Sequence, residues 1–164
     1  MTQKVSLETL HGMMVFLGGA ANGLEKLLGR GAPSITYRAG RSSGLKQKVS
    51  RSEPDDLERA LEAVWDEMCN IGMRWAFEVY HRKGEPKVVT DEDGVTKVHL
   101  VFRNCLVRNT LFRYGYPQRL SLCSMNHGLF CGLIEQIHGR HANLDIIHAG
   151  ENACIKLLTL EPKK

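Results

Sequence analysis

The sequence predicts an α+β fold in which helices pack on one face of a mostly antiparallel meander sheet, with residues 1–164 forming a single domain. Two observations carry this prediction. Apolar residues recur at helical spacing in three segments before Arg74, and from Arg74 onward the pattern changes to the two-fold alternation of strands. A length of 164 residues lies in the usual range for one domain with one core.

The N-terminal region predicts two helices. Apolar residues from Leu7 to Leu28 recur at near-helical spacing, and a break is expected near Gly18-Gly19 because glycine weakens a helix interior. Pro33 opens the second helix, since proline suits the first helical turn. In that helix Gly40 and Gly44 lie four residues apart, which indicates close packing against another backbone or, alternatively, space for a ligand.

The segment 55–73 is the clearest helix of the chain. Asp55 and Asp56 lie in its first turn, where the helix dipole favours a negative charge, and Gly72 stands just past its end.

The mixed acidic and basic composition of the whole chain and its formal charge of +4 permit an anionic partner without indicating one.

Three strand-like runs between residues 74 and 107 predict an antiparallel meander. The first run alternates, so that Trp75, Phe77 and Val79 share one face. The last two runs are separated by Asp93-Gly94, which is a favourable pair for a tight turn.

Residues 117–160 hold three of the five cysteines and four of the seven histidines. A helix-period segment runs from Pro117 to His138. Two strands, His141–His148 and Ala153–Leu160, follow it around the polar turn 149–152.

Side chains able to bind zinc gather in this C-terminal region. A zinc site takes about four nitrogen, sulfur or oxygen ligands. The predicted metal ligands are Cys123, Asp145, His148 and Cys154. The helix offers His127 or Cys131 as a further ligand. The alternative is that Cys123 and Cys154 are buried, inert thiols.

Four short motifs occur in a consistent order along about four fifths of the chain. They are YRAGRSSG at 37–44, Asn104-Cys105, Cys123 with HGLF and GL at 127–133, and Gly150-Glu151 with CIKL at 154–157. Together they resemble the 4-vinyl reductase domain family, which is also called the predicted hydrocarbon-binding proteins.

The resemblance implies a fold shared with subunits of the vesicle-tethering TRAPP complex and with haem-nitric-oxide-type ligand domains. Such a domain is usually a dimer that holds a small apolar or tetrapyrrole-like molecule between helices and sheet. In phenol-responsive regulators with this domain, three cysteines and a glutamate hold a structural zinc. Cys123 and Cys154 match the first and last of these cysteines, whereas Asp145 and His148 stand where glutamate and cysteine are expected.

We therefore predict a homodimeric domain that binds or senses a small apolar molecule and signals through a regulatory protein partner. Its pocket is expected between the helices and the meander. The predicted lining residues are Phe16, Tyr37, Trp65, Trp75, Phe77, Phe102 and Phe130. Apolarity alone identifies them, and an ordinary core would contain the same residue types.

Two other functions are alternatives to this one. A Cys/His pair four residues apart, such as Cys123 and His127, suits an activated thiolate, and the C-terminal pattern also resembles the aminothiazoline carboxylate hydrolases. Basic residues between Arg38 and Arg51 lack interleaved aromatics and predict a solvated face rather than a nucleic-acid site. The longest apolar stretch, 13–21, is too short to span a membrane, and cysteine usage with no secretion-type N-terminus favours the cytoplasm.

Overall fold

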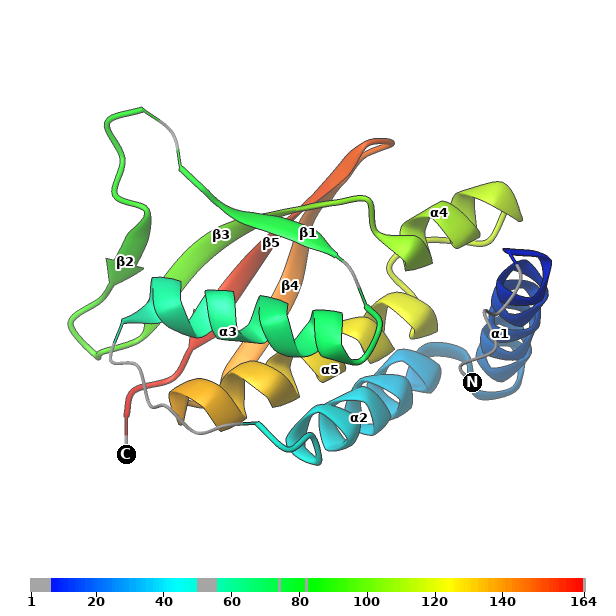
Figure 1. The fold of residues 1–164 in the computed structure, drawn as a ribbon, viewed down its shortest axis with the longest axis horizontal. Helices are drawn as coiled ribbons and strands as arrows, with labels where there is room; N and C mark the ends of the chain where they lie inside the picture. The colour runs from blue at the N-terminus through cyan, green and yellow to red at the C-terminus, as the bar shows by residue number, and fades with distance from the viewer. Residues whose placement is uncertain (1–6, 50–55, 74, 82, 164) are drawn as a thin grey trace, which may run out of the picture.

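The computed structural model describes residues 7–49, 56–73, 75–81 and 83–163. Helices and strands alternate in blocks along the chain (Figure 1). The helices are α1 (Leu7–Leu28), the 3-10 turn η1 (Gly29–Gly31), α2 (Ala32–Leu45), α3 (Leu57–Asn70), α4 (Leu106–Arg113) and α5 (Ser121–His138). The strands are β1 (Ala76–Tyr80), β2 (Val88–Thr90), β3 (Thr96–Arg103), β4 (Ala142–Ala149) and β5 (Ala153–Leu160).

One antiparallel sheet unites the predicted meander and the predicted C-terminal ribbon. Its strand order is β1-β3-β5-β4, with β2 also paired to β3. The last strand therefore lies inside the sheet, and its residues from Ala153 to Leu160 pair with β3 from Arg103 back to Thr96. The turn at Asp93-Gly94 forms as predicted, with the amide of Gly94 donating to the carbonyl of Asp91 at 3.0 Å.

Helices cover one face of this sheet, with α3 and α5 lying across it and α2 packed on the far side of α5 (Figure 1). The alternation in β3 agrees with this layering, because Val98, Leu100 and Phe102 are buried while Lys97 and His99 are exposed. The predicted α+β class, with helices on one face of an antiparallel sheet, is confirmed.

The interior between sheet and helices is aromatic. Trp75, Phe102 and Phe130 are at most 2% exposed, and the rings of Phe102 and Phe130 meet edge to face with centroids 5.6 Å apart. Burying such rings contributes about 1.5–3 kcal/mol each relative to leaving them in water.

Four glycines let α2 and α5 cross with their backbones almost in contact. A β-carbon on Gly40 or Gly44 would collide with the carbonyl of Met125 or of Leu129 in α5. Conversely, a β-carbon on Gly128 would collide with the carbonyl of Tyr37 in α2. The spacing of Gly40 and Gly44 therefore serves close helix packing, the first of the two predicted readings.

Two predicted elements differ from the structure. Helix α1 is continuous through Gly18-Gly19, where a break was expected, and Gly18 faces the ring of Tyr116 so closely that a β-carbon would lie 2.9 Å from it. The third strand was predicted to run to Val107, but it ends at Arg103. Asn104 then takes a positive φ of 51°, and α4 begins after Cys105.

Candidate functional site

A groove of about 470 Å³ lies between α3 and the edge strand β1. Its floor is apolar, and two of the predicted lining residues, Trp65 and Phe77, form it with their rings edge to face at a centroid distance of 6.0 Å. Leu61 and Val79 complete the floor. This volume lies within the range of about 300–1,000 Å³ that small-molecule sites occupy.

Charged side chains stand at the rim of this groove in pairs. Lys87 donates to Glu58 at 3.1 Å, and Arg103 donates to Glu78 at 3.0 Å. Both pairs are half exposed, so each contributes little to stability and leaves the rim wet. The groove thus combines an aromatic floor with a solvated charged edge.

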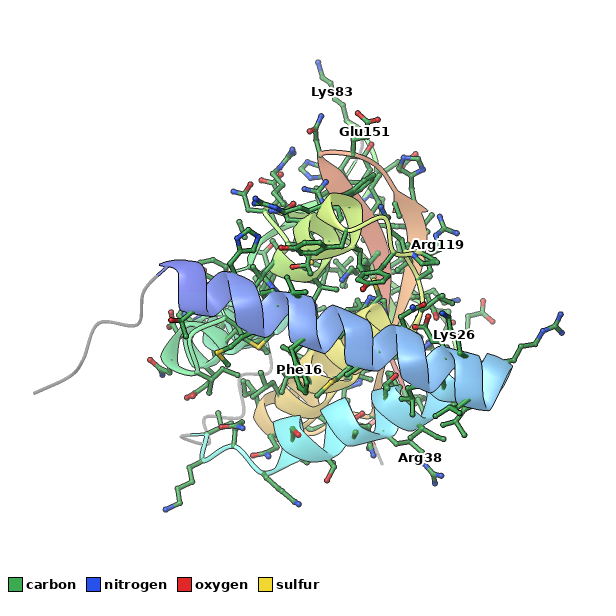
Figure 2. The ribbon with its side chains drawn as sticks, turned by 90° about the vertical axis from the view of Figure 1, so that its right-hand side faces the viewer. Phe16, Lys26, Arg38, Lys83, Arg119 and Glu151 are labelled. Carbon is green, nitrogen blue, oxygen red and sulfur yellow. The ribbon has the colours of Figure 1, made fainter. Side chains whose placement is uncertain are left out.

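The other predicted lining residues lie elsewhere. Trp75, Phe102 and Phe130 are core residues beneath the groove, and the Phe77 ring stacks on Phe102 with centroids 5.2 Å apart. Phe16 is 75% exposed on the outward face of α1, which crosses one side of the molecule with nothing in front of it in Figure 2.

Tyr37 lines a second cleft of about 350 Å³ between α2, α5 and β4, together with Arg38, His127 and Asp145. Its hydroxyl donates to the carbonyl of Ala142 at 3.4 Å. Burial, and then Cys131 beside it, raises the pKa of Tyr37 above its ordinary value, so the phenol is neutral.

A small enclosed cavity, called here the chamber, lies where α4, α5, β4 and β5 meet. It is lined by Cys105, Arg108, Gln118, Cys123, Asn126, His127, Ile146, Ala149, Cys154 and Lys156. Its volume is about 10 Å³. That is room for one water molecule.

Lys156 lines the chamber and is only 4% exposed. Its ammonium lies 4.0 Å from the centre of the Phe102 ring. Burial lowers the pKa of Lys156, while the neighbouring thiols, first that of Cys105 and then that of Cys123, act in the opposite direction. Sequence reasoning gave Lys156 no role. The available signal was its place in β5, where alternate residues from Cys154 to Leu160 face inward and one of them is a lysine.

The predicted zinc ligands are divided between two places. Cys123 and Cys154 both line the chamber, but Asp145 and His148 are exposed outside it, and Asp145 accepts a hydrogen bond from Asn143 at 2.7 Å. Among the described residues no three His, Cys, Asp or Glu side chains are arranged to hold a metal ion. A lysine ammonium between the thiols is also a poor neighbour for a divalent cation. The donor set in this arrangement does not fit zinc.

Of Cys123 and His127, the pair considered for a hydrolase, His127 is buried and Cys123 is partly buried. Burial raises the pKa of the Cys123 thiol. Burial and then the charge of Lys156 lower the pKa of His127 to about 2. The pair is therefore neutral, and the geometry gives no support to an activated thiolate.

Cys131 is fully buried in the core beside Tyr37, and burial raises its pKa to about 12. One turn further along α5, Glu135 is only 8% exposed and accepts from Arg41 in α2. Its carboxylate also accepts from the amide of Ala142 at 3.0 Å and lies 2.9 Å from His141. Sequence reasoning assigned Glu135 no role, although this buried carboxylate joins α2, α5 and β4.

Comparison with known proteins gives a fold relationship. No family model matches the sequence, and no curated protein matches it. Among solved structures, the chain is similar to the crystal structure of the phenol-responsive sensory domain of the transcription activator PoxR with phenol. The match has a TM-score of 0.63 at 16% identity and covers 90% of this chain and 74% of that chain. At this identity the similarity shows that the fold is shared.

Within the described part of the chain, none of the helices has the length and apolar character needed to cross a membrane.

Proposed function

We propose that this chain binds or senses a small apolar aromatic molecule in the groove between α3 and β1. The observation that carries the proposal is the aromatic floor made by Trp65 and Phe77, in a groove of about 470 Å³ on a fold shared with a phenol-responsive sensory domain. A one-ring or two-ring hydrocarbon or phenol suits this volume and this floor.

Membership of the 4-vinyl reductase domain family is part of the proposal. The motif glycines support it, because Gly40, Gly44 and Gly128 all lie at the α2–α5 crossing, where a side chain would not fit. A cytoplasmic location belongs to the same proposal and is consistent with five free cysteines.

Ligand binding would be transmitted through α3, which lies on the core, to a regulatory protein partner. A ligand shifts a conformational equilibrium only by its difference in affinity for the two states. Trp65 touches the groove and is on the same helix as the core residues Val64 and Met68, so closure of α3 on a ligand would also move buried contacts.

Dimerisation is proposed to use the outward face of α1. Large apolar side chains are exposed there. They are Met13 at 55%, Phe16 at 75%, Leu17 at 45%, Leu27 at 84% and Leu28 at 44%. A patch of this kind is a common mark of a protein interface.

Titration with 1-naphthol, followed by its fluorescence and by native mass spectrometry, tests the proposed groove. We expect one bound molecule per chain, and a loss of affinity of tenfold or more in Trp65→Ala because the largest floor side chain is removed. Phe112→Ala is the matched control, since Phe112 is 49% exposed on α4 and does not line the groove. Equal binding by Trp65→Ala and the wild type would refute the assignment of the groove.

The zinc that the family resemblance implies is tested on the same purified protein by elemental analysis. About one zinc ion per chain would support the metal predicted from the family resemblance, and would require a ligand set different from the arrangement described above.

A further inference from the structure

Two basic side chains, those of Lys156 and Arg108, line the chamber. Lys156 is 4% exposed, and within the described part of the chain its ammonium takes part in neither a hydrogen bond nor an ion pair. Arg108 is 7% exposed. Its terminal nitrogens donate hydrogen bonds to the carbonyls of Gly150 and Glu151 and to the side-chain oxygen of Asn109. Its Nε is buried and has no partner among the described residues.

No carboxylate is among the described residues that line the chamber. The remaining polar lining consists of thiols, of the amides of Gln118 and Asn126, and of the imidazole of His127. Burying a charge is costly unless it is paired and hydrogen-bonded, and here two cations share one small space. The chamber therefore holds two basic groups with no carboxylate beside them among the described lining residues.

The N-terminus of α4 adds to this positive potential, whereas that of α5 is already met by the carboxylate of Glu25, which accepts from the amide of Ser121 at 2.8 Å. Cys105 occupies the N-cap position of α4, and Cys123 is in the first turn of α5. Both residues line the chamber. The N-terminal turn of a helix carries unpaired amides and a partial positive charge, which favour an anion.

We propose that the chamber binds a small monovalent inorganic anion of the halide class, held between Lys156 and Arg108 with the amides of Gln118 and Asn126 as further donors. The chamber, about 10 Å³, is no larger than one water molecule requires, so it excludes sulfate, phosphate and organic acids, and a chloride or bromide ion, which is larger than water, enters only if the lining side chains move apart. The site shares none of its lining residues with the groove between α3 and β1, and so does not depend on the proposed function.

Thermal unfolding of the full chain in sodium bromide or chloride, compared with sodium gluconate at equal ionic strength, tests this site. A ligand that binds only the folded state stabilises it in proportion to the logarithm of one plus its concentration over Kd. We expect the midpoint temperature to rise with halide concentration in the wild type. Gluconate, which is too large for the chamber, should give no such rise.

The matched variants are Lys156→Met and Lys87→Met. Lys156→Met removes a buried charge and should abolish the halide-dependent rise, whereas Lys87→Met removes a half-exposed surface charge and should leave it unchanged. An equal halide effect in Lys156→Met would overturn the proposal. If Lys156→Met does not fold, the site is tested with wild-type protein by the width of the chloride-35 NMR resonance. A resonance that the protein broadens, and that added bromide narrows again, supports the site. A resonance that the protein does not broaden overturns it.

Discussion

Substitution of Gly128 by alanine should destabilise the protein, although alanine is the better helix former. In an open helix, glycine to alanine stabilises by about 0.5–1 kcal/mol. At Gly128 the added methyl group would meet the backbone of α2 at Tyr37 and Arg41. Backbone atoms cannot rotate away as a side chain can, so α2 must move outward as a unit.

Overpacking of this kind costs about 1–3 kcal/mol. Subtracting the gain in helix propensity leaves an expected loss of up to about 2.5 kcal/mol in the free energy of unfolding. Gly19→Ala in α1 is the control, because a β-carbon at Gly19 meets no described atom within 4 Å, and it should stabilise by about 0.5–1 kcal/mol. Urea unfolding followed by circular dichroism measures both. If Gly128→Ala and Gly19→Ala changed the free energy of unfolding in the same direction, the close contact between the α2 and α5 backbones would be refuted.

Three other substitutions test separate features. The pKa of His127 is lowered to about 2, so below pH 6.5 the unfolded chain binds a proton that the folded chain does not. The free energy of unfolding should therefore fall with decreasing pH by up to about 1.4 kcal/mol per pH unit. Urea titrations at pH 7 and pH 5 should show that His127→Gln removes this part of the slope. Phe16→Glu should convert the proposed dimer to a monomer in light scattering, whereas a persistent dimer would place the interface away from α1. Asp56→Ala should cost about 1 kcal/mol, because Asp56 caps α3 by accepting from the amide of Glu58, and Asp66→Ala in the exposed interior of that helix should cost less than half as much.

Local sequence signals predicted most of the secondary structure. The helix α3, its end before Gly72, and the strand Ala153–Leu160 depend on short-range interactions that few tertiary contacts override. Asp56, predicted in the first turn of that helix, is its N-cap, and Asp55 lies outside the described residues. Where the local signal was weak, packing decided: α1 stays helical through two glycines, one of which faces Tyr116, and the apolar Leu106 and Val107 belong to a helix instead of a strand.

In the candidate sites, too, some features follow from local sequence patterns and others only from tertiary packing. Trp65 and Phe77 both line the groove between α3 and β1, where the buried stripe of a helix meets a strand face, and their role in binding a ligand stays a prediction. The sequence could not show that β5 lies beside β3, because strand pairing depends on the whole sheet. That pairing places Cys154 opposite Phe102 and brings Lys156 against the Phe102 ring, next to Cys105 and Arg108 of the α4 segment. Periodicity determined which face of each element is buried, and only the tertiary structure determined which charges meet there.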